Sequence, residues 1–151
     1  MAMKSGALKG MVEEGPLFAK NRTPRIAYFI SPHGYGHAAR AAAVMEAIRE
    51  LDPTVALDVF TSVPRWFFRD SLSGDFEYHD LLTDIGMVQR TPMEADLPET
   101  LRRLNRFLPF RQSRLTDLAD RLRKKGCTLV VSDISLWAFL WPGRQVFHLS
   151  W

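Results

Sequence analysis

The stretch Ser31-Pro32-His33-Gly34-Tyr35-Gly36-His37-Ala38-Ala39-Arg40 joins an apolar run to a segment whose apolar residues recur at helical spacing. The run, residues 25–30, predicts a buried strand, and residues 38–51 predict a helix. In a strand, glycine turn and helix of this kind, the glycines let backbone amides approach a ligand, and the first helical turn favours an anion. A purely structural turn needs no histidines, so His33 and His37 mark this stretch as the candidate site.

Length and composition indicate one globular domain. The chain has 151 residues, of which 46% are hydrophobic and 25% charged, which is enough for one core and too short for two full α/β domains. Cys127 is the single cysteine, so neither an intrachain disulfide nor a cysteine metal site is expected. No signal peptide and no apolar run of about 18 residues is seen. We therefore expect a cytoplasmic protein without a transmembrane segment and without a bound metal.

Basic residues are concentrated in one part of the chain. Nine lysines and arginines lie between Arg102 and Lys125, although the net charge is only +3. A solvated helix face is the favoured interpretation. A weaker alternative is a surface for phosphates or for peripheral contact with an anionic membrane. No nucleic-acid partner is expected.

The remaining chain divides into elements that alternate between strand and helix. Residues 1–24 lack any period and are interpreted as a flexible leader. Leu97 begins a long amphipathic helix or a helix pair with a break at Pro109. The stretch 83–92 shows no period and is expected to be a loop. Further strands are predicted at residues 55–61, 76–81 and 127–132, with a short helix at 64–69.

This order predicts an α/β fold with a Rossmann-like, doubly wound parallel sheet in a single, incomplete domain. Right-handed crossovers give the strand order 3-2-1-4, in which the strands at 25–31 and 127–132 are neighbours. Ligands bind at the carboxyl ends of strands beside such a reversal. The loop that carries His33 and His37 should therefore face the same crevice as Asp133, which follows the last predicted strand.

Two kinds of chemistry compete for this crevice. Gly34, Gly36 and Ala39 match the dinucleotide fingerprint G-x-G-x-x-A, which suggests a fragment of an NADP-type oxidoreductase. That fingerprint also requires an acidic residue at the end of the second strand, where Thr61-Ser62 stands; Asp58 falls within the strand. Arg65 could still accept a 2′-phosphate, which keeps this alternative open.

The second interpretation uses the histidines. The dipole of the following helix favours a neutral His37, which can accept a proton, and a facing carboxylate from Asp133 would orient it. A contact of His37 with its own turn and a loop-shaping role for His33 remain alternatives. Among the loop residues, Asp84, Gln89 and Arg90 could reach a ligand, although a solvated loop explains them as easily. His79 is interpreted as a strand-surface residue rather than a ligand.

Three motifs resemble one family. The stretch 28–40 looks like the Gly-His-Gly-Phe-Gly-His-Ala-Thr-Arg signature of a group of glycosyltransferase-like bacterial proteins and of the non-kinase half of plant L-arabinokinases. Residues 84–89 resemble the Asp-x-Gly-x-Val-Gln segment of that group, and residues 129–133 resemble its strand followed by an aspartate. These proteins are similar to the GT-B glycosyltransferases, in which an N-terminal Rossmann-like domain binds the acceptor and a second domain binds the nucleotide-sugar.

The resemblance implies a function for residues 25–135. They would form the acceptor-side domain of a glycosyltransferase that transfers a sugar from a nucleotide-sugar, expected to be a UDP-sugar, to a hydroxyl of a small-molecule or lipid-linked sugar acceptor. His37 and Asp133 are then the catalytic candidates, and the substrate-binding candidates are His33, Gly34, Gly36, Asp84 and Gln89. A non-catalytic sugar or nucleotide-sugar binding module is the alternative. The fragment alone is expected to be inactive, with no cofactor bound.

The tail, residues 136–151, differs from the rest of the chain. It contains three of the four tryptophans and has neither a helical nor a strand period. Because tryptophan has a single codon, reading one base earlier gives glycine and alanine at two fixed points and permits a helix, a Gly-Ile-Pro turn and a new strand elsewhere. We therefore hypothesise a frameshift near Ser135 that makes the tail aberrant and removes the nucleotide-sugar domain.

Overall fold

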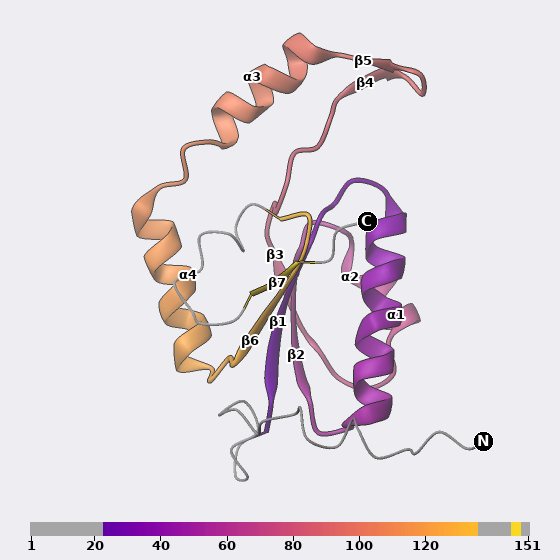
Figure 1. The fold of residues 1–151 in the computed structure, drawn as a ribbon, viewed down its shortest axis with the longest axis vertical. Helices are drawn as coiled ribbons and strands as arrows, with labels where there is room; N and C mark the ends of the chain where they lie inside the picture. The colour runs from indigo at the N-terminus through magenta and orange to yellow at the C-terminus, as the bar shows by residue number, and fades with distance from the viewer. Residues whose placement is uncertain (1–22, 136–145, 149–151) are drawn as a thin grey trace, which may run out of the picture.

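The computed structural model describes residues 23–135 and 146–148, whose main sheet is parallel and has helices on both faces (Figure 1). The sheet has five strands in the order β3-β2-β1-β6-β7, and every neighbouring pair is parallel. Its strands are β1 (Arg25–Ile30), β2 (Ala56–Thr61), β3 (Glu77–Asp80), β6 (Leu129–Asp133) and β7 (Val146–His148). The α/β fold and the neighbourhood of the first and fourth predicted strands are thus confirmed.

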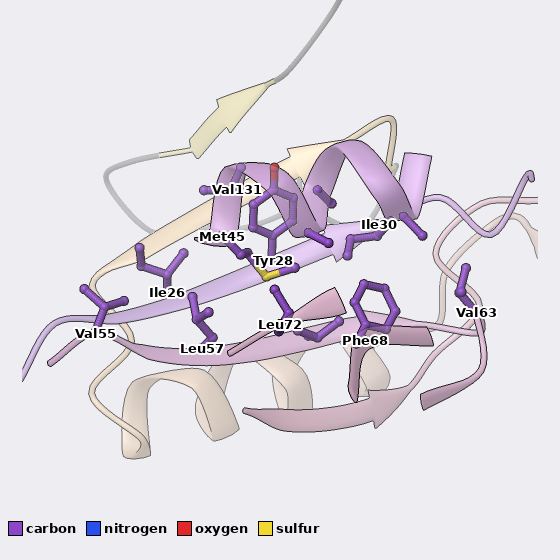
Figure 2. Packing of buried hydrophobic residues seen from close by; sticks show 14 residues of the cluster. Ile26, Tyr28, Ile30, Met45, Val55, Leu57, Val63, Phe68, Leu72 and Val131 are labelled. Carbon is purple, nitrogen blue, oxygen red and sulfur yellow. The ribbon is translucent and has the colours of Figure 1, made fainter. Parts of the chain in front are cut away.

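The central strand β1 is buried on both faces, as a strand in a doubly wound sheet must be. Tyr28 points into a core cluster with Met45 of α1 (Tyr35–Leu51) and Phe68 of α2 (Arg65–Ser71), as Figure 2 shows. Phe29 belongs to the opposite cluster, with Leu122 of α4 (Gln112–Lys124). Successive strand residues therefore supply the two cores in alternation.

Of the two predicted alternatives, one long helix or a helix pair, the helix pair is present, with its break at Pro109. Helix α3 (Leu97–Phe107) ends before Leu108, whose backbone is extended, and α4 follows. Proline disfavours helical geometry in the residue before it, which explains the break. Figure 1 shows that α4 covers the sheet face opposite α1 and that α3 extends beyond the sheet. None of the helices in the described residues is both long and apolar enough to cross a membrane.

The loop expected over residues 83–92 contains a strand that the sequence did not predict. Strand β4 (Gln89–Thr91) pairs in antiparallel fashion with β5 (Glu94–Ala95) to form a separate two-stranded sheet. All five of these strand residues are exposed. Strands this short and without a buried face cannot produce a visible hydrophobic alternation.

The tail also contains one described strand. Val146–His148 forms β7, in which Val146 pairs with Val130 of β6. Three residues are too few to show a strand period, which is why no strand was predicted there. The predicted flexible leader lies outside the described residues up to residue 22, as do residues 136–145 and 149–151 of the predicted aberrant tail.

Candidate active site

The candidate site lies where β1 and β6 end side by side. Ile30, the last residue of β1, is the register partner of Asp133, and the amide of Ser31 donates to the carbonyl of Asp133 over 3.1 Å. Because the strands are parallel and adjacent, residues that follow β1 and residues that end β6 meet at one edge of the sheet. The predicted adjacency of the histidine loop and Asp133 is therefore present.

His37 and Asp133 form a direct contact. His37 lies in the first turn of α1, and its Nδ1 is 3.1 Å from Oδ2 of Asp133. The Asp133 side chain is 1% exposed, whereas that of His37 is 26% exposed. A buried carboxylate thus holds the ring of a histidine that is still open to solvent, which is the arrangement of a base and its orienting acid.

Arg40 is a third member that the sequence analysis missed. Its Nη2 donates to Oδ1 of Asp133 and lies 3.0 Å from Nδ1 of His37. Arg40 follows His37 by three residues, so the helical period places both on one face of α1. That spacing was the available signal. The guanidinium balances the charge of the buried Asp133 carboxylate, which would be costly if left unpaired.

The contacts of Nδ1 define two states of His37. When Nδ1 carries the proton, it donates to Asp133 and leaves a lone pair on Nε2, which can accept a proton from a substrate. When Nδ1 is bare, it accepts from Arg40 and Nε2 carries the proton. Only the first state serves as a general base through Nε2.

Tyr28 closes the buried side of this group. Its hydroxyl and Nε of Arg40 are buried and lack hydrogen-bond partners among the described residues. Burial raises the pKa of Tyr28, and the nearby Asp133 carboxylate raises it further. The phenol therefore stays protonated and adds no charge beside Asp133.

The turn after Asp133 is strained. Ile134 has φ of 52°, a left-handed conformation that a β-branched residue rarely adopts. The turn is closed by Ser132, whose Oγ accepts from the amide of Ser135 over 3.0 Å. The backbone strain therefore lies in the turn that directly follows the buried carboxylate of Asp133.

The segment after β3 packs onto the same edge and brings Asp84 beside the histidine loop. Thr83 Oγ1 donates to the carbonyl of Ile30 over 2.5 Å, and Ser31 Oγ donates to Oδ2 of Asp84 over 3.2 Å. Gly86 has φ of 52°, and a Cβ there would lie 2.2 Å from the His33 ring. Gly86 therefore gives His33 the space in which its ring packs.

The two glycines of the loop have different roles. Gly34 precedes α1 with φ of 74°, which favours glycine, whereas Gly36 lies in the first turn. Apart from its chain neighbours and the backbone of its own helix, no described residue places an atom within 4 Å of a Cβ built on Gly36. The space in front of this turn is open, so a ligand could approach the backbone there.

Gln89, another predicted binding residue, belongs to the separate two-stranded sheet. It is exposed in β4 and is not among the residues that line the cavity beside His33 and Asp84. Arg90, its neighbour, pairs with Asp96 over 2.9 Å. A role for Gln89 in substrate binding stays a prediction.

A cavity of about 720 Å³ opens beside the histidine loop. Its lining includes His33 and Asp84. Arginines of α3, of α4 and of the segment between them also line it, together with Phe107 and Phe110, whose rings meet edge to face at 4.9 Å. A cavity of this size is typical of small-molecule sites.

A second polar cluster links the three neighbouring strands β1, β2 and β3 through their side chains. Asp58 of β2 is buried and accepts from Arg25 over 2.6 Å, from His79 over 2.7 Å and from Lys125 over 2.9 Å. Burial alone would raise the pKa of Asp58, but these hydrogen bonds outweigh it and hold that pKa well below its usual range. Asp58 is therefore an ionised, fully engaged carboxylate.

This cluster also accounts for His79 and Glu77. Ligand atoms of Asp58, Glu77 and His79 lie within 4.8 Å of one another, a spacing that a metal could use. Arg25 and Lys125 already pair with both carboxylates, so the charges are balanced by the protein itself. His79 also stacks on Phe60 at 4.3 Å, in accord with a structural residue on the strand.

Comparison with known proteins gives few matches. No family model matches the chain, and no curated protein matches it significantly. Among solved structures, a UGT transferase from Siraitia grosvenorii in complex with UDP is similar, with 13% identity and a TM-score of 0.47. The similarity covers 82% of this chain and 27% of the transferase, so this chain spans about a quarter of its length. The fold assignment itself rests on the strand pairing described above.

Proposed function

We propose that this chain is the acceptor-side domain of a GT-B-type glycosyltransferase and that His37 is its general base. The observation that carries the proposal is the 3.1 Å contact between His37 Nδ1 and Asp133 Oδ2, at the edge where neighbouring parallel strands end. The motif resemblance of residues 28–40, 84–89 and 129–133 supports the same assignment.

The proposed reaction begins with an acceptor hydroxyl beside His37. Nε2 takes the hydroxyl proton as the oxygen attacks the anomeric carbon of the sugar donor, and the bond from that carbon to the UDP oxygen breaks. Asp133 stabilises the imidazolium that results. The donor is a UDP-sugar held by a further domain, and the acceptor is a small-molecule or lipid-linked sugar. No resident metal or cofactor takes part in the proposed steps.

The environment of Asp58 argues against the NADP-type oxidoreductase. A dinucleotide site needs a free carboxylate for the ribose at the end of the second strand. Asp58 is 0% exposed and already accepts three hydrogen bonds. Arg65, the alternative phosphate ligand, stacks over Phe76 at 5.9 Å.

Calorimetric titration of the chain separates these two classes. We would titrate it with UDP-sugars, with sugar acceptors and with NADPH. Acceptor binding without NADPH binding supports the proposal. Saturable binding of NADPH would overturn it in favour of the oxidoreductase.

Turnover tests the role of His37 directly. In a longer protein that joins this sequence to a nucleotide-sugar domain, His37→Ala should lower turnover by about 10² to 10⁴, the usual contribution of a general base. His33→Ala should lower it less, because His33 does not contact Asp133 in the proposed arrangement. Equal, small losses for both variants would remove His37 from the role of base.

A further inference from the structure

We propose that the cavity between the histidine loop and the α3–α4 junction binds the phosphate group of a phosphorylated sugar acceptor, through Arg111 and Arg114. This inference rests on the proposed function only in assigning the ligand the role of acceptor. The charge and the lining of the cavity argue for a phosphate ligand independently. The basic segment between residues 102 and 125 thereby gains a specific role beyond that of a solvated face.

The charge of the cavity lining favours an anion. Four arginines line it, contributed by both helices and the segment between them: Arg103, Arg106, Arg111 and Arg114. Among the described residues that line the cavity, the carboxylates are Asp80 and Asp84. Arg103 is paired with Glu99, so Arg106, Arg111 and Arg114 leave an excess of one positive charge over these two carboxylates. An anion such as a phosphate monoester, which carries about −1.5 to −2 at neutral pH, would be attracted to this lining.

The arginines at the start of α4 are available to a ligand. Within the part of the chain that the structure describes, the side chains of Arg111 and Arg114 have no hydrogen bond or ion pair, whereas Arg103 pairs with Glu99 over 3.0 Å. The first turn of α4 contains no acidic residue. Two cations at the positive end of a helix repel that end, and a bound anion would relieve the repulsion.

The rest of the lining suits a sugar phosphate. Phe107, Pro109 and Phe110 supply apolar surface between the arginines, on which a ring can pack. His33 also lines the cavity and precedes His37, in the first turn of α1, by four residues. A phosphate held at Arg111 and Arg114 would leave the remainder of the ligand directed along the cavity toward the histidine loop.

The test is calorimetric titration of the full chain with glucose 6-phosphate, N-acetylglucosamine 1-phosphate, farnesyl diphosphate and unphosphorylated glucose. We expect saturable binding of phosphorylated probes and at least tenfold weaker binding of glucose. Preference for the sugar phosphates indicates a soluble acceptor, and preference for farnesyl diphosphate a lipid-linked one. Absence of binding by all three phosphorylated probes overturns the proposal.

Matched variants locate the binding site. The double variant Arg111→Gln/Arg114→Gln should weaken binding by about tenfold to a hundredfold, because it removes two charge-assisted contacts. Arg102→Gln lies outside the cavity lining and should change the affinity less than twofold. Both arginines of the double variant are exposed, so an unchanged circular dichroism spectrum is expected.

Equal affinity losses in the double variant and in Arg102→Gln would overturn the assignment and indicate general charge attraction. The proposed function fails separately: if His37 is not the base, turnover is insensitive to His37→Ala while phosphate binding persists. If the phosphate site is wrong, the phosphorylated probes do not bind, while His37→Ala still lowers turnover.

Discussion

His37 Nδ1 lies 3.1 Å from Asp133 Oδ2, although the two residues are 96 positions apart in the sequence. The topology creates this contact, because β1 and β6 are neighbours and end at the same edge of the sheet. Burial of the Asp133 carboxylate and its pairing with Arg40 hold the acid in place. The ring of His37 is thereby oriented before any substrate binds, which is what a general base requires.

Gly86→Ala should disturb His33 through direct collision. The new methyl group would lie 2.2 Å from the His33 ring at a backbone φ of +52°, so we expect a loss of about 2 to 4 kcal/mol in the free energy of unfolding. The matched control is Gly126→Ala, at φ +72°, where no atom of the described residues beyond the adjacent ones lies within 4 Å of the added Cβ; this variant should lose only about 1 to 2 kcal/mol. Urea unfolding measures both, and equal losses would contradict the close packing of His33 on Gly86.

Asp58 should make the fold sensitive to acid. Its pKa is lowered in the folded state, so the stability it contributes is fully present above the unfolded pKa of about 4 and is lost as the pH falls toward the folded pKa. Asp58→Asn should cost about 2 to 4 kcal/mol at neutral pH and should reduce the loss of stability below pH of about 4. Unfolding measured from neutral to acidic pH tests this, and parallel pH profiles for both proteins would contradict it.

Gly36→Ala should stabilise the fold and weaken ligand binding. Glycine within a helix costs up to about 1 kcal/mol relative to alanine, and within the described part of the chain no side chain beyond those of the adjacent residues lies within 4 Å of the added methyl group. The same methyl group occupies the open space from which a ligand would approach the backbone. The midpoint temperature of thermal unfolding should therefore rise, while the affinity for the acceptor, measured by titration, should fall. A destabilised Gly36→Ala protein would show that this space is not open.

The strand order, the closeness of His37 to Asp133 and the break at Pro109 can be predicted from the sequence. The alternation of strands and helices implies the strand order, and the strand order brings His37 to Asp133. The break at Pro109 follows from the restrictions that proline imposes on Leu108. These features depend on local pattern and handedness, which a single sequence contains.

Other features depend on register and orientation, which the sequence does not display. Asp58 contacts Arg25 because of the register in which β1 and β2 pair. It contacts Lys125 because the carboxyl end of α4 lies against these strands. The helical period of α1 places Arg40 on the same face as His37. It does not predict that the Asp133 carboxylate contacts both side chains. The hairpin of β4 and β5 has no buried face and so leaves no pattern.

The tautomer of His37 tests the central claim most directly. Long-range ¹H–¹⁵N correlation spectra of the labelled chain, recorded in mildly alkaline solution where a free imidazole is neutral, distinguish the two ring nitrogens of each of the four histidines. The His37→Gln variant assigns the signal. We predict a proton on Nδ1, donated to Asp133, and a bare Nε2, with a shift toward the other tautomer in Asp133→Asn. A proton on Nε2 in the unmodified chain, with Nδ1 accepting from Arg40, would contradict the role of His37 as a base.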